Sequence, residues 1–169
     1  MKKIKIKLKK RRLLERVQTH CYYTGEARKQ IGFPEPLAAA IQASDDDTAQ
    51  LNDHIGVAVV EVAKILSRFL ATCSTVENGN ASYPDIFETE FNLLVPDNFP
   101  NETISLLTTA IENYCVTRTL QLWLAQHKPD ESAIIANEAQ QAMYGIRELL
   151  STRKRPTIDN TPFDNLIKL

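Results

Sequence analysis

Alternating apolar and charged residues at the start of the chain predict a β-strand. Lysines alternate with Ile4, Ile6 and Leu8 between residues 3 and 9. Because successive side chains of a strand point to opposite faces, this segment has one apolar face and one lysine face. A single short strand is not stable alone, so it must pair with another segment of this chain or with the sheet of a neighbour.

A second alternating segment, near residues 86–95, predicts a strand with an acidic face. Its apolar positions are separated by Glu88, Glu90 and Asn92. Opposite charges on adjacent strands attract, so this face complements the lysine face of the first strand. One hypothesis is that the two strands pair, within one subunit or between subunits. The alternative is that each charged face serves solubility alone.

Apolar residues at three- and four-residue steps predict helices over much of the remaining chain. The expected helices cover about 13–31, 37–43, 46–73, 101–126 and 131–152. A short Lys-Pro-Asp loop joins the last two, which should therefore form a long antiparallel αα-hairpin. The predicted fold is mostly α, a helical bundle with this hairpin and a small β element.

The same pattern divides the chain into three parts. Residues 1–16 form a basic N-terminal arm, and residues 17–152 form a helical domain with a β insertion at 77–95. Residues 153–169 form an extended tail that contains two prolines and ends in apolar residues. An apolar end after a polar linker is typical of a docking segment, on its own domain or on a neighbour. The candidate assembly residues are Ile4, Ile6, Leu8, Phe163, Leu166 and Ile167.

Charge is distributed very unevenly between the arm and the body. Residues 1–16 hold nine Lys/Arg and one acid, a charge of +8, while the whole chain carries −1, so residues 17–169 carry −9. An arm need not be basic to help the body fold, so this asymmetry indicates a partner. Candidate contacts with DNA phosphates are Lys5, Lys7, Lys9, Arg11 and Arg12.

Sequence-specific recognition of nucleic acid is not expected. The arm lacks the interleaved aromatic residues that stack on bases, and no recognition helix stands out. Non-specific contact with DNA, dominated by phosphate charge, stays open.

The chain shows no pattern that predicts an enzyme. Phosphate-binding glycine loops, zinc-protease motifs and nucleophile elbows are absent, and His20, His54 and His127 stand alone. Three widely spaced cysteines predict free thiols in a reducing compartment. No stretch approaches about eighteen apolar residues, so no membrane span is expected. We therefore expect no catalytic residue, no metal site and no cofactor.

Three motifs between about residues 45 and 156 carry a family resemblance. An acidic cap at 44–51 precedes a helix, a proline-led helix with late aromatics follows at 99–123, and a Tyr-Gly-Ile-Arg-Glu-Leu-Leu run at 144–150 precedes basic residues and Pro156. In these motifs the chain resembles the head-to-tail connector (adaptor) proteins of tailed bacteriophages and prophages. The basic N-terminal strand and the insertion at 77–95 are additions to the family's pattern.

The resemblance implies a structural virion protein without catalytic residues. Such subunits form a ring, commonly a dodecamer, that joins the portal to the tail and lines the passage for DNA. The implied partners are further copies of the chain, the portal protein and other tail or neck proteins. The implied location is the neck of the virion, with the host cytoplasm during assembly. Two alternatives are another neck or tail-completion protein, and a non-specific nucleic-acid-binding protein that acts through the basic arm.

Overall fold

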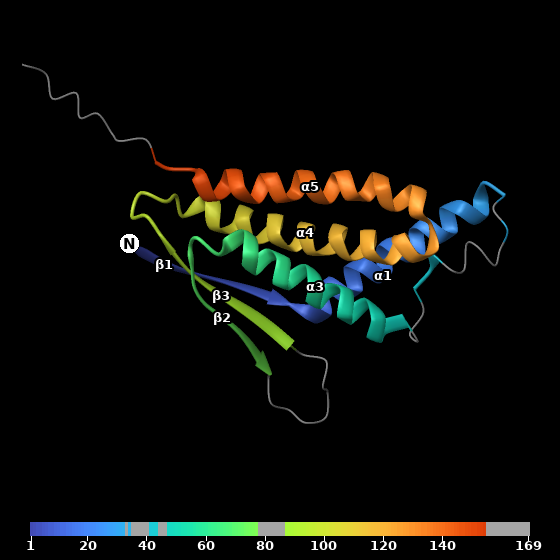
Figure 1. Cartoon of the computed structure of the whole chain (residues 1–169), viewed down its shortest axis with the longest axis horizontal. Helices are drawn as coiled ribbons and strands as arrows, with labels where there is room; N and C mark the ends of the chain where they lie inside the picture. Colours follow the sequence, from blue (N-terminus) through green and yellow to red (C-terminus); the bar gives the residue numbers. More distant parts are fainter. Residues whose placement is uncertain (33, 35–40, 44–46, 78–86, 155–169) are drawn as a thin grey trace, which may run out of the picture.

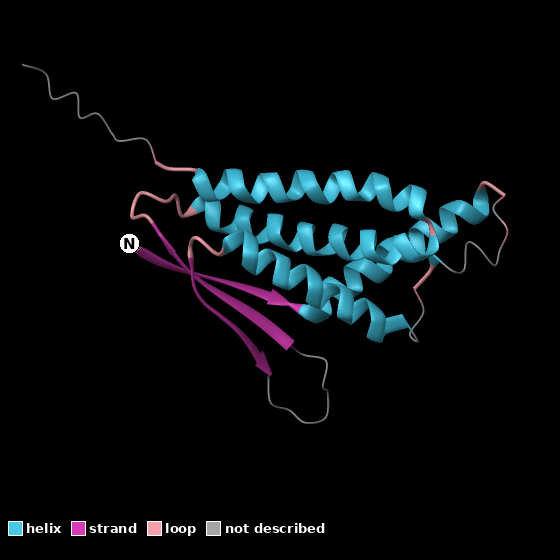
Figure 2. Ribbon diagram, viewed as in Figure 1, coloured by secondary structure: helices cyan, strands magenta, loops and turns pink. Residues whose placement is uncertain are grey.

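A computed structural model describes residues 1–32, 34, 41–43, 47–77 and 87–154 of the chain. These residues form a mostly helical protein with one small sheet, as predicted (Figures 1 and 2). The elements in order are β1 (Lys2–Lys9), α1 (Lys10–Gln30), α3 (Thr48–Leu66), β2 (Leu70–Glu77), β3 (Phe87–Val95), α4 (Glu102–His127) and α5 (Pro129–Ser151). The predicted tail residues Phe163, Leu166 and Ile167 lie outside the described residues, as does most of the helix expected at 37–43.

The sheet joins the two predicted strands within one subunit. Its order is β1-β3-β2, and both pairings are antiparallel. Ile6 lies opposite Phe91, and Lys7 lies opposite Glu90. Lysine and glutamate side chains therefore share one face of the sheet, while the apolar side chains share the other. The helices gather on one side of this sheet, as Figure 2 shows.

Helix α1 continues the chain directly from β1 without a loop. Lys9, the last residue of β1, precedes the first residue of the helix. Leu13, Val17 and Cys21 are buried and extend the core that Ile6 and its neighbours begin. The predicted boundary of a separate arm at residue 16 therefore falls inside this helix.

Helix α4 is the central element of the bundle. It packs against α5 along its length and also contacts α3, α1 and β1. Its buried side chains, which include Leu107, Ile111, Cys115 and Trp123, come from several sides of the helix. The predicted αα-hairpin is confirmed, because α4 and α5 lie side by side and only Lys128 separates them (Figure 1).

The prediction of a helix over residues 46–73 is wrong at its C-terminal end. Helix α3 ends at Leu66, and residues 70–77 form the strand β2. The apolar spacing continues to Phe69, but the following segment contains the β-branched residues Thr72, Thr75 and Val76, which favour a strand. The Phe69 carbonyl accepts a 2.7 Å hydrogen bond from the backbone N–H of Leu94. Pairing with β3 therefore begins at Phe69, where a longer helix would have continued. The expected β insertion is consequently longer, with strands at 70–77 and 87–95.

Two glycines allow a direct test of the local backbone. Gly56 lies inside α3, and a methyl group added there would meet nothing within 4 Å. We expect Gly56→Ala to raise the free energy of unfolding by about 0.5–1 kcal/mol, because alanine loses less backbone entropy in a helix.

Gly32 follows α1 with a φ of 81°, a left-handed conformation. Gly32→Ala should lower stability by about 1 kcal/mol. Urea titrations measure the unfolding free energy of both variants. Equal changes in the two would contradict the helical conformation of Gly56 and the left-handed conformation of Gly32.

Candidate functional site

The lysine face predicted for the first strand is engaged by acids of β3. Lys5 Nζ lies 2.8 Å from a carboxylate oxygen of Glu90. Lys7 Nζ lies 2.9 Å from the other Glu90 oxygen and 3.0 Å from Glu88. Hydrogen bonds from Lys5 and Lys7 lower the pKa of Glu90, and bonds to Glu90 and Glu88 raise the pKa of Lys7. The complementarity of the two charged faces is therefore satisfied within the subunit.

The arginines proposed for DNA contact also have partners in the chain. Arg11 pairs with Glu15 one helical turn away, at 2.9 Å. Arg12 lies 3.3 Å from Glu112 of α4, a carboxylate whose side chain is 10% exposed. Arg16 lies 3.6 Å from the same carboxylate. The basic start of α1 thus ties this helix to α4.

Among the five cations proposed for DNA contact, only Lys9 has no ion pair with another described residue. The other four are ion-paired but keep exposed side chains, with exposed fractions between 48% and 70%. Binding to phosphate would have to compete with the carboxylates that already hold them.

The structure places Ile4, Ile6 and Leu8, the residues expected to serve assembly, in the core of their own subunit. Their side chains are 5%, 1% and 1% exposed and belong to the core of their own subunit. A strand that pairs with β3 and is covered by helices has no apolar face left for a neighbour. In this fold these three residues stabilise the subunit.

A charged cluster that the sequence did not predict links α3 to α4. The Arg118 guanidinium makes two 2.8 Å hydrogen bonds to the Glu61 carboxylate, one to each oxygen. The Tyr114 hydroxyl donates to Glu61 at 2.8 Å, and Arg118 also donates to Gln121 at 2.7 Å. The hydrogen bond from Arg118 lowers the pKa of Glu61, while burial and the adjacent carboxylate raise the pKa of Tyr114. We call this set the Glu61 clamp.

The Glu61 clamp lines a cleft of about 480 Å³ between α3, α4 and α5. Catalysis would require an acid, base or nucleophile that can exchange a proton near neutral pH. Arg118 holds Glu61 as a carboxylate, and the raised pKa of Tyr114 keeps its hydroxyl protonated. The clamp therefore fits a structural link between helices, with its charges already paired.

Neither the two buried cysteines nor the described metal-ligating side chains form a reactive site. Cys21, Cys73 and Cys115 are all free thiols, as predicted. Burial raises the pKa of Cys21 to about 11 and that of Cys115 to about 12, so both are poor nucleophiles. The described residues contain no group of three or more His, Cys, Asp or Glu side chains placed to hold a metal ion.

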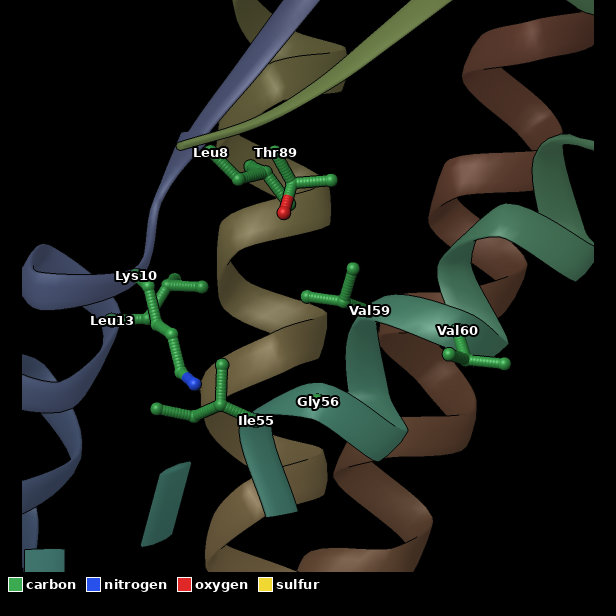
Figure 3. A pocket seen from close by; sticks show the side chains of 8 residues that line it. All are labelled: Leu8, Lys10, Leu13, Ile55, Gly56, Val59, Val60 and Thr89. Atoms are coloured by element: carbon green, nitrogen blue, oxygen red, sulfur yellow. The ribbon is translucent and has the colours of Figure 1, made fainter. Parts of the chain in front are cut away.

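An open apolar pocket of about 340 Å³ lies where the sheet meets α3 (Figure 3). Leu8 and Thr89 form its sheet end, and the start of α1 faces α3 across it. We call it the α3 groove. Its lining residues are Leu8, Lys10, Leu13, Ile55, Gly56, Val59, Val60 and Thr89.

The groove opens onto an exposed apolar stripe of α3. Val57 is 45% exposed and Val60 is 55% exposed. Neither valine is part of the buried core, although both belong to a helix whose opposite face is fully buried. The three- and four-residue spacing that predicts the apolar face of this helix likewise leaves Val57 and Val60 off that face.

Comparisons with protein-family models, with curated proteins and with solved structures find no match for this chain. The resemblance to phage connector proteins therefore stays a prediction. Within the residues that the structure describes, no helix has both the length and the apolar character that a membrane span requires.

Pairing of β1 within the subunit predicts a clear contrast between its two faces. We expect Ile6→Ala to lower the free energy of unfolding by about 2–5 kcal/mol, the usual cost of a cavity at a buried isoleucine. Lys7→Ala should leave the unfolding midpoint nearly unchanged, because exposed ion pairs contribute little. Urea unfolding at a concentration where the chain is monomeric measures both. If the strand paired only with a neighbour, Ile6→Ala would leave the monomer as stable as the wild type.

The Glu61 clamp predicts a pH-dependent loss of stability. The pKa of Glu61 is lower in the folded chain than its ordinary value of 4.5, so its ion pair stabilises the fold above that pH. This contribution is lost as the pH falls through the folded pKa. Glu61→Gln should cost about 1–2 kcal/mol near neutral pH, and its difference from wild type should shrink in acid. Urea titrations at several pH values measure this difference, and Glu138→Gln, at an exposed position of α5, is the control. A difference that does not change with pH would refute the assignment.

Proposed function

We propose that this chain is a structural assembly protein, a subunit of an oligomeric ring that joins the portal of a phage head to the tail and surrounds the DNA passage. The observation that carries the proposal is the α3 groove, an open apolar surface, together with the exposed side chains of Val57 and Val60 on the same helix. Contiguous exposed apolar surface marks sites of protein–protein contact. The family resemblance supplies the kind of assembly.

The distribution of charged groups supports binding over catalysis. Lys5, Lys7, Glu90, Glu61 and Arg118 all have partners inside the subunit. Beside these paired charges, Val57 and Val60 of α3 remain 45% and 55% exposed. Exposed apolar side chains of this kind support contact with another protein.

The acidic body of the chain fits a conduit for DNA. Residues 17–169 carry −9, and phosphate groups are repelled by negative charge. A wall of this charge lets DNA slide past without binding to it. The neck of the virion, with assembly in the host cytoplasm, is the location that this role implies.

A second candidate function is non-specific binding of nucleic acid through residues 1–16. Their charge of +8 favours it. The carboxylates of Glu88, Glu90 and Glu112 weaken it, because they already neutralise part of that charge.

Two measurements on the full chain separate the candidates. We expect sedimentation velocity and negative-stain microscopy to show ring-shaped oligomers as the protein concentration rises. We expect DNA binding to be weak at physiological salt and to change little in a Lys5→Ala/Lys7→Ala variant. A chain that is monomeric at every concentration, yet binds DNA with a steep salt dependence that this variant removes, would favour the second candidate.

A further inference from the structure

The α3 groove combines an apolar lining with two polar side chains, Thr89 and Lys10. Buried side chains of the core, among them Leu13 and Ile55, form part of its surface. Gly56 contributes no side chain, and nothing stands within 4 Å of where a methyl group would be. The volume of about 340 Å³ lies at the lower end of the range for small-molecule sites, about 300–1,000 Å³. The groove is therefore large enough for a short alkyl chain.

Thr89 brings a hydroxyl into this apolar lining. Thr89 is only 9% exposed, and Figure 3 shows its oxygen directed from β3 toward α3. Within the residues that the structure describes, the hydroxyl forms no hydrogen bond. Buried hydroxyls in folded proteins nearly always have a hydrogen-bond partner. The Thr89 hydroxyl therefore favours a ligand that brings an oxygen or an N–H group.

The start of α1 makes the same groove electrically positive. Lys10 and Leu13 line it from the first residues of this helix, and Lys10 extends toward Ile55 in Figure 3. The first turn holds no acidic residue, and no side chain caps its backbone N–H groups. The positive end of a helix dipole and an adjacent ammonium group both favour an anion.

The lining also selects the kind of anion. Among the described residues that line the groove, Lys10 alone is charged. A single lysine in apolar surroundings matches a singly charged carboxylate better than a doubly charged phosphate, because a second buried charge without a partner is costly. The apolar remainder of the lining matches an alkyl chain.

We propose that the α3 groove binds a medium-chain alkyl carboxylate. The carboxylate lies between Lys10 and the Thr89 hydroxyl, and the alkyl chain lies along α3. This binding goes beyond the proposed assembly function and does not depend on it. It also regulates the same surface, because a bound carboxylate covers apolar groups that a neighbouring subunit would contact.

Titration calorimetry of the full chain with sodium octanoate, below the concentration at which octanoate forms micelles, tests the site. We expect one octanoate to bind per chain. Octan-1-ol has the same chain without the charge and should bind at least about tenfold more weakly, because its contact with Lys10 is not charge-assisted. Octylamine, a cation at neutral pH, should not bind. Each methylene removed from octanoate should lower the affinity by up to about fourfold.

Two variants separate the contacts of the carboxylate from those of the alkyl chain. Lys10→Met keeps the length of the side chain and should lower the affinity for octanoate about tenfold, while the affinity for octan-1-ol stays the same. Thr89→Val should weaken both ligands, because its hydroxyl contacts an oxygen of each. Lys9→Met, on the exposed lysine face of β1, is the matched control and should bind octanoate like the wild type. Urea unfolding without ligand checks that each variant folds, and the ligand series on the wild type decides the result where one does not.

The outcomes separate this inference from the assembly function. A folded wild-type chain that does not bind octanoate would overturn the inference and leave the assembly function standing. Equal affinities for octanoate and octan-1-ol, or an unchanged affinity for octanoate in Lys10→Met, would also overturn it, since the groove would then be an unselective apolar surface. Selective binding by a chain that forms no oligomer at any concentration would support the inference and contradict the assembly function.

Discussion

The antiparallel pairing of β1 with β3 is the contact on which the rest of the fold depends. It joins the first residues of the chain to a strand about eighty residues later and places Ile6 beside Phe91 in the core. Since α1 follows β1 without a loop, the pairing also sets the direction of that helix and brings Leu13 over the same core. Helix α1 then reaches α4 through Arg12 and Glu112. One strand contact thereby positions the sheet, the first helix and the central helix relative to one another.

Polar and apolar groups have opposite roles in this subunit. Charged side chains pair inside it in the ladder of β1 and β3 and between Glu61 and Arg118. Apolar side chains fill the core and also remain on the surface of α3, at Val57 and Val60. Ion pairs between exposed groups add little affinity at an interface, whereas buried apolar surface contributes substantially. The subunit thus retains on its surface the kind of group that drives association.

The sequence predicted the elements whose pattern is local and missed the features that depend on distant residues. Alternation around Ile6 and around Glu90 sufficed for β1 and β3, and periodicity sufficed for the hairpin. Strand β2 was missed because Phe69 continues the apolar spacing of α3. The change from helix to strand is set by pairing with β3, where the backbone N–H of Leu94 donates to the Phe69 carbonyl. The Glu61 clamp was missed because its ion pair joins residues 57 positions apart. Charge complementarity fits pairing within or between subunits equally well. The sequence therefore left the partner of β1 open, and only the three-dimensional structure identifies it as β3 of the same subunit.

The lysines of β1 also matter before the fold exists. Ribosomes make the chain from its N-terminal side at about 5–20 residues per second, so β1 precedes β3 by about 4–16 seconds. During that interval an unpaired strand with Ile4, Ile6 and Leu8 on one face could add to any exposed sheet edge. A lysine at every second position makes neighbouring copies repel one another until Glu88 and Glu90 arrive. The charges that later pair across the sheet therefore first act to keep nascent chains apart.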